Sequence, residues 1–153
     1  MLRAGTKAPA FTLDDGAGGK RSLAGILERG AALVALYKVG CPVCQLTFPF
    51  LDRMAKGSLQ VIGISQDNQR DTEKFRKSYA PQMAMLYDRD RDGYPASNAF
   101  GISHVPSIFL IEPDGTISKS WEGFVKREME SVGERTGVAP FRPDEKVPEW
   151  KAG

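Results

Sequence analysis

The feature that most constrains this chain is an apolar stretch that leads into a pair of cysteines. Residues 31–37, Ala-Ala-Leu-Val-Ala-Leu-Tyr, include no charged residue. Such a run is typical of a central strand that is buried on both faces of a sheet. Cys41-Pro42-Val43-Cys44 follows, and apolar side chains then recur at helical spacing as far as Met54. The sequence therefore predicts a buried strand, a short connection and a helix that begins at the cysteines.

Strands and helices continue to alternate along the chain. Helices are predicted over residues 23–28, where Ser22 is the expected cap, and over 71–79, 95–100 and 126–136. Further strands are predicted over 11–13, 59–65, 83–87, 107–111 and 116–121, and the last two flank the turn Glu112-Pro113-Asp114-Gly115. This pattern favours an α/β fold with a central mixed β-sheet flanked by helices.

The length of 153 residues fits a single domain over 1–153, with a core over about 5–136. The tail over 138–153 contains Pro140, Pro143 and Pro148 and is predicted to be extended rather than helical. Trp150 is expected to pack this tail back onto the domain. The loop Asp88–Asp92 lacks the spacing of a calcium loop and is predicted to be a solvated turn.

Composition and charge exclude several kinds of partner. The chain is 41% hydrophobic and 26% charged, with 21 Lys and Arg against 19 Asp and Glu. This balance is typical of a globular protein. The net charge is only +2 and the Lys and Arg residues are spread along the chain, which argues against nucleic acid as a partner. No apolar run approaches the ~20 residues of a membrane span. The beginning of the sequence shows no secretory h-region, which fits either the cytoplasm or export after removal of a leader.

The cysteine pair indicates redox chemistry. Two cysteines cannot form a disulfide-rich scaffold or a four-cysteine metal site. Cys41 is expected at the N-cap of the helix, with Pro42 at the first helical position. There the sulfur faces unpaired amides and the positive end of the helix dipole, which favour the thiolate. Cys44, one turn later and more sheltered, would resolve a mixed disulfide formed by Cys41. The pair would itself be the redox cofactor, with no metal.

Several motifs resemble those of a known superfamily. Cys41-Pro42-Val43-Cys44, Pro49 and Val105-Pro106 are similar to landmarks of the thioredoxin superfamily and occur in the same order. Residues 5–13 and 100–115 resemble its TlpA/ResA and AhpC/TSA branches, which comprise thioredoxin-like disulfide reductases and peroxiredoxins. The likeness covers about residues 5–136. It implies a thioredoxin fold with an N-terminal extension and an extended C-terminal tail.

The resemblance also implies a partner-binding element. Val105-Pro106 would be a cis peptide beside the cysteines, and the Val105 backbone would pair with the partner. That partner would be a protein or small molecule that carries a disulfide or a thiol. By the same likeness, Pro49 would kink the helix that the cysteines begin, as a proline inside a helix does in any case.

Two departures from the superfamily leave the proton acceptor for the resolving thiol open. Ala35 stands where thioredoxins have a buried aspartate, and Thr47 stands where ResA-like proteins have a glutamate. Water, Lys38 or His104 would then have to accept the proton. His104, the only histidine, precedes Pro106 by two residues and is a candidate acid or base near the cysteines.

Two alternative functions use the same residues. A peroxiredoxin-like thiol peroxidase with antioxidant activity would have Cys44 as its peroxidatic residue and Cys41 as its resolving thiol. However, Pro106 stands where such enzymes have a peroxide-polarising arginine, and proline cannot supply that charge. A copper-binding module would use Cys41, Cys44 and His104, although the cysteines of such modules are typically three residues apart. The sequence therefore favours a thiol–disulfide oxidoreductase.

Overall fold

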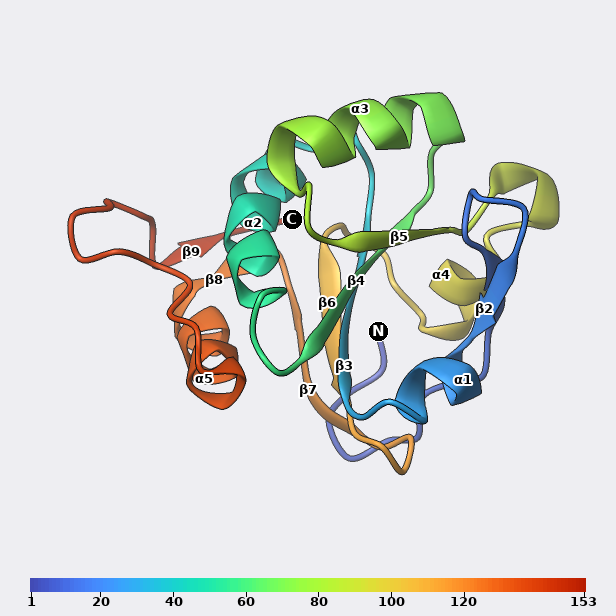
Figure 1. Ribbon diagram of the computed structural model, residues 1–153, viewed down its shortest axis with the longest axis horizontal. Helices are drawn as coiled ribbons and strands as arrows, with labels where there is room; N and C mark the ends of the chain where they lie inside the picture. Colours follow the sequence, from blue (N-terminus) through green and yellow to red (C-terminus); the bar gives the residue numbers. More distant parts are fainter.

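The computed structural model describes residues 1–153 and contains a mixed sheet with helices on both faces (Figure 1). The sheet has 7 strands in the order β2-β1-β5-β4-β3-β6-β7. These strands are β1 Thr12–Asp14, β2 Lys20–Ser22, β3 Ala32–Tyr37, β4 Gln60–Ser65, β5 Ala84–Tyr87, β6 Ser107–Ile111 and β7 Ile117–Glu122. The helices are α1 Leu23–Leu27, α2 Pro42–Met54, α3 Gln69–Tyr79, α4 Pro95–Ala99 and α5 Lys126–Thr136. A separate pair joins β8 Phe124–Val125 to β9 Trp150–Lys151.

The predicted central strand is confirmed. β3 pairs in parallel with β4 and antiparallel with β6, and all of its residues are buried. A strand with neighbours on both edges and helices on both faces has no contact with water, which is why residues 31–37 are apolar without alternation. The sheet is mixed because β5 runs parallel to β4 while β1, β6 and β7 pair antiparallel with their neighbours.

The two faces of the sheet carry separate apolar cores. Leu33, Ala35 and Tyr37 of β3 belong to the core on the side of α2, α3 and α5. Val34 and Leu36, the alternate residues, pack on the other side with residues of α1 and α4. This division follows from the period of two along a strand. The helix that begins at the cysteines is therefore held on one face of the sheet over the side chain of Tyr37.

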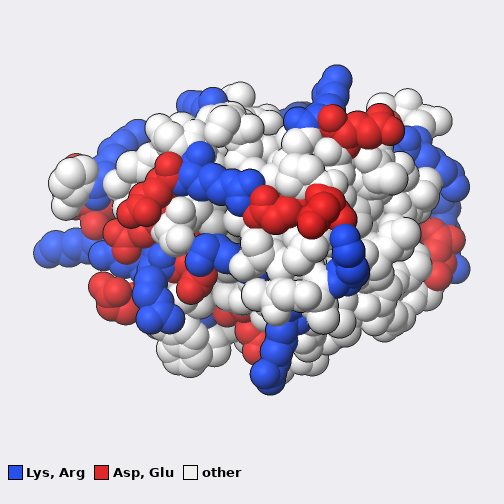
Figure 2. All heavy atoms as spheres, turned by 90° about the horizontal axis from the view of Figure 1, so that it is seen from below, with Lys and Arg blue, Asp and Glu red and all other residues white.

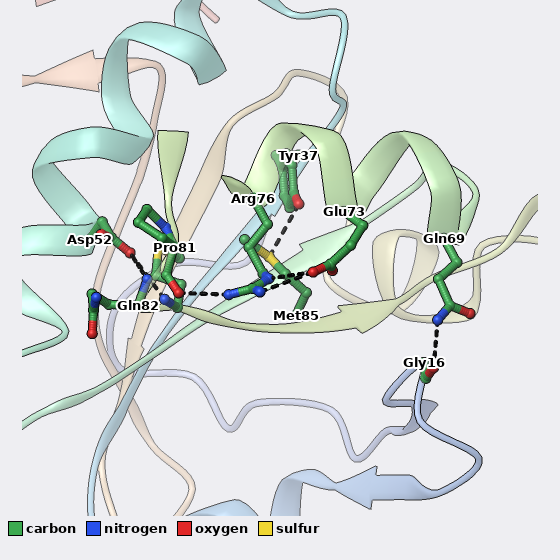
Figure 3. Close-up of polar contacts among 10 residues, drawn as sticks. Gly16, Tyr37, Asp52, Gln69, Glu73, Arg76, Pro81, Gln82 and Met85 are labelled. Carbon is green, nitrogen blue, oxygen red and sulfur yellow. Dashed lines mark hydrogen bonds and ion pairs between the residues drawn. The ribbon is translucent and has the colours of Figure 1, made fainter. Parts of the chain in front are cut away.

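Gly63 allows the larger core to close around Tyr37. A Cβ atom at this position would lie 2.5 Å from Met85 Sδ and 3.1 Å from the Tyr37 ring, so a larger residue would force them apart. The Tyr37 hydroxyl donates to Met85 Sδ at 3.1 Å, as Figure 3 shows. The rings of Phe48 and Phe75 lie 4.2 and 4.8 Å from the Tyr37 ring. α2 and α3 are thereby packed on one aromatic cluster.

Polar contacts fix the connection between α3 and β5 (Figure 3). The Asp52 carboxylate accepts hydrogen bonds from the Gln82 and Met83 amides at 2.9 and 3.0 Å. Arg76 donates to the carbonyl oxygen of Pro81 at 2.6 Å. These contacts provide partners for backbone groups that leave the helix and do not join the sheet, as partly buried backbone requires.

One prediction for the loop before α4 is wrong. Asp88 is completely buried instead of solvated, and its carboxylate accepts from the amides of Ala96 and Ser97 at 2.8 Å each. It therefore caps the start of α4 from a position 8 residues before Ala96. Only the following Asp90–Asp92 forms an exposed 3₁₀ turn.

The tail is extended as predicted, but a different aromatic residue anchors it. Trp150 is 63% exposed, so its predicted packing role is wrong. Phe141 packs instead, with its ring 4.9 Å from that of Phe50 and 5.8 Å from that of Phe124. Arg53 of α2 also forms a bidentate ion pair with Glu145 at 2.5 and 2.7 Å. The tail is thus attached along the outer side of α2.

The surface carries charges of both signs. Figure 2 shows Lys and Arg side chains alternating with Asp and Glu over the visible face, without a large patch of one sign. No helix combines the length and the apolar character that are needed to cross a membrane.

Candidate active site

Cys41 occupies the predicted position at the start of α2. It is the N-cap, with extended backbone angles, and Pro42 takes the first helical position. The Cys44 amide donates to Cys41 Sγ at 3.1 Å. Cys41 is half-buried. Its sulfur is therefore accessible and accepts one of the amides that a helix leaves unpaired at its first turn.

Cys44 lies one turn further along and is completely buried. Burial is the main cause that raises the pKa of its thiol far above the ordinary value, and its hydrogen bond with Cys41 adds to the effect. A backbone hydrogen bond from Lys38 acts in the opposite direction. At neutral pH Cys44 is therefore a protonated thiol, shielded from solvent behind Cys41.

The Val105–Pro106 peptide bond is cis, as the resemblance implied. It lies directly before β6, and the Val105 carbonyl oxygen is 3.5 Å from Cys41 Sγ, within reach of a thiol hydrogen bond. The Gly123 amide donates to the Pro106 carbonyl oxygen at 2.8 Å. The structure thus brings together the cysteine pair and the Val105-Pro106 backbone, two sites that are distant in the sequence.

His104 is close to this loop but does not contact the cysteines. Its side chain is 58% exposed, and Nδ1 lies 3.0 Å from Ser103 Oγ and 3.6 Å from Glu122 Oε2. It lines a cavity of about 250 Å³ together with Lys38 and Val105. An acid–base role for His104 therefore stays a prediction.

The ligand set of the copper alternative is not assembled. No three His, Cys, Asp or Glu side chains cluster closely enough to hold a metal ion, so His104 does not join Cys41 and Cys44. The geometry gives this alternative no support.

Asp67 also belongs to the surroundings of the cysteines, although it was not predicted from the sequence. This residue follows β4, and its carboxylate accepts a hydrogen bond from the Val39 amide at 2.8 Å. Its negative charge is a minor addition to the effect of burial on the Cys44 pKa. A signal for it exists in the sequence, because the ends of the parallel strands β3 and β4 meet at one edge of the sheet, where Tyr37 pairs with Ser65. An acidic residue just after β4 therefore has to lie near the segment that leads to Cys41.

Comparisons with known proteins agree with this geometry. Residues 4–120 match the model of the AhpC/TSA family. The thiol-disulfide oxidoreductase ResA of Bacillus subtilis is 25% identical over 130 residues, which cover 82% of this chain and 70% of that protein. A Mycobacterium tuberculosis protein with the name "Putative peroxiredoxin Rv2521" is 30% identical over 129 residues, which cover 76% of this chain and 82% of that protein.

A solved structure shows the same fold. The thioredoxin domain of a thiol-disulfide oxidoreductase from Bacteroides vulgatus superposes with a TM-score of 0.74 at 24% identity. The superposition covers 88% of this chain and 98% of that one. The predicted thioredoxin fold is confirmed.

Proposed function

The chain belongs to the AhpC/TSA family and is a thiol–disulfide oxidoreductase, and we propose that Cys41 is its attacking thiol and Cys44 its resolving thiol. The observation that carries these roles is the contrast in burial, since Cys41 is half-buried and Cys44 completely so. A partner disulfide can reach only the first sulfur. The redox group is the cysteine pair itself.

The reaction consists of two exchanges of sulfur bonds. The Cys41 thiolate attacks one sulfur of the partner disulfide, the partner's S–S bond breaks, and one partner sulfur leaves as a thiolate. Cys44 then loses its proton and attacks the Cys41 sulfur. This second step forms the Cys41–Cys44 disulfide and releases the second partner sulfur, so the partner gains two electrons and the enzyme loses two. The reverse sequence oxidises a dithiol partner.

The Val105 backbone supports a proposal for how the partner is held. Its carbonyl lies 3.5 Å from Cys41 Sγ, so an extended partner segment that pairs with this backbone would place its own disulfide at the attacking sulfur. Main-chain pairing reads no side-chain sequence. The substrates proposed here are therefore proteins with a disulfide in an extended, accessible segment.

The burial of Cys44 argues against the peroxidase alternative. A peroxidatic cysteine has to react as a thiolate with peroxide, whereas burial raises the pKa of Cys44 and hides its sulfur from solvent. Pro106 follows Val105, whose carbonyl oxygen lies 3.5 Å from Cys41 Sγ, and it stands where a peroxiredoxin would have arginine but offers no positive charge. The site is therefore suited to disulfides rather than to peroxide.

This preference is tested by comparing two substrates. The protein is expected to reduce insulin with dithiothreitol as the electron source, while its kcat/KM for hydrogen peroxide stays below ~10⁴ M⁻¹s⁻¹, the lower bound for an efficient enzyme. Turbidity measures the reduction of insulin, and the loss of hydrogen peroxide measures the peroxidase rate. Peroxide turnover above that bound that disappears in Cys44→Ser would contradict the assignment.

A further inference from the structure

The end of the tail runs along β8 and returns to the active site. Trp150 pairs with Val125 and Lys151 pairs with Phe124. The chain then passes over Gly123, where a Cβ atom would lie 2.2 Å from the Lys151 carbonyl oxygen. Gly123 has a φ of +77° and is the residue whose amide donates to Pro106. A glycine is required here both by its conformation and by the close approach of the tail.

Gly153 lies against the proposed binding edge for the partner. A Cβ atom at Gly153 would be 2.6 Å from the Val105 carbonyl oxygen, the same atom that lies 3.5 Å from Cys41 Sγ. Figure 1 likewise places the C-terminal end of the chain beside α2, the helix that Cys41 caps. An extended partner segment cannot occupy the Val105 backbone while the tail is there.

The contacts that hold this last segment are few. β9 has two residues, both exposed, and the Trp150 side chain is directed largely into solvent. The Lys126 amide donates to the Glu149 carbonyl oxygen at 3.1 Å, and the Lys126–Glu149 ion pair at 3.5 Å is solvent-exposed. Exposed pairs of this kind contribute little. The firm anchors of the tail, Phe141 and Glu145, come earlier in the chain.

From this arrangement we propose that residues 150–153 form an internal strap that competes with protein substrates for the Val105 edge. This inference rests on the proposed function, because it takes the Val105 backbone as the place where the partner binds. The strap would open beyond Val147, which packs against the core, while Val147 and the earlier anchors keep it close to the site. A small disulfide needs only the Cys41 sulfur and would not compete with the strap.

The expected size of the effect follows from the fraction of open molecules. The apparent affinity for a ligand is proportional to the fraction of protein that is competent to bind it. If the strap is closed for about nine-tenths of the time, binding is weakened about ten-fold. Removing the strap, residues 150–153, is therefore expected to raise kcat/KM for insulin about ten-fold. The rate with 2-hydroxyethyl disulfide, a small substrate, is expected to stay within about two-fold.

A point variant tests the strap without shortening the chain. Gly153→Val places a side chain against the Val105 carbonyl and is expected to increase insulin reduction in the same direction as the truncation. Ala152→Val is the control, since it places the same valine side chain at the neighbouring, exposed position. It is expected to behave like the unmodified protein. Thermal melting shows whether each variant is folded.

The outcomes separate the strap from the proposed function. Reduction of both disulfides by the unmodified protein, with faster insulin reduction in the truncated chain and in Gly153→Val, supports the strap. Reduction of both disulfides with unchanged or slower insulin rates in folded variants overturns the strap and leaves the oxidoreductase function intact. Failure of the unmodified protein to reduce either disulfide contradicts the proposed function itself.

Discussion

The Cys44→Ser variant is expected to accumulate as a mixed disulfide with its partner and to lose turnover by ~1,000-fold or more. Cys41 remains at the start of α2, where the residue-44 amide faces its sulfur, so the first attack still takes place. The serine hydroxyl cannot attack the Cys41–partner bond, and the reaction stops after one step. Mass spectrometry without a reducing agent, after incubation with oxidised insulin, measures the covalent adduct.

Cys41→Ser is the matched control for this trap. It retains Cys44, but that sulfur is buried and its thiol has a raised pKa, so neither turnover nor an adduct is expected. The two variants differ from the unmodified protein by the same exchange of sulfur for oxygen. An insulin adduct through Cys44 in the Cys41→Ser variant, with none in Cys44→Ser, would reverse the proposed roles.

Phe48→Ala is expected to lower the free energy of unfolding by about 3–5 kcal/mol. Phe48 is completely buried on α2, with its ring 4.2 Å from that of Tyr37 and 5.2 Å from that of Phe75. Removing the ring leaves a cavity between α2, α3 and the sheet. Since domains of this kind are stable by about 5–15 kcal/mol, the loss is a large part of the total. Urea unfolding followed by tryptophan fluorescence measures it.

Leu46→Ala provides the comparison for Phe48→Ala. It removes an apolar side chain from the same helix, but Leu46 is only partly buried, so a clearly smaller loss is expected. Equal losses for the two variants would show that the aromatic cluster does not hold α2 in place.

Local patterns were sufficient to predict most of the fold. β3 is apolar throughout because it is buried on both faces of the sheet. α2 has apolar residues at helical spacing because one side of it packs on the core. α5 was predicted with the bounds Lys126–Thr136 that the structure has, because the residues that follow include Gly137, a residue with positive φ that ends the helix. The N-cap position of Cys41 was likewise evident from Pro42 beside it.

The wrong predictions concern side chains whose surroundings are set by residues outside their own segment. Asp88 is in a charged, polar segment, yet the fold buries it against the amides of Ala96 and Ser97. Trp150 was expected to anchor the tail, but Phe141 is the residue that packs against the rings of Phe50 in α2 and Phe124 in β8. Hydropathy describes the preference of a residue for burial, and only the three-dimensional packing decides which of several candidates is buried.

The roles of the two cysteines are tested most directly by competitive alkylation of the reduced protein. Iodoacetamide in limiting amount near neutral pH, followed by mass spectrometry of peptides, compares the two sulfurs within the same molecule. Modification of Cys41 well before Cys44 is predicted, because Cys41 is accessible while burial hides Cys44 and raises its pKa. The difference should persist at mildly alkaline pH, since a thiol with a raised pKa stays protonated there. Preferential modification of Cys44 in the folded protein would contradict the account.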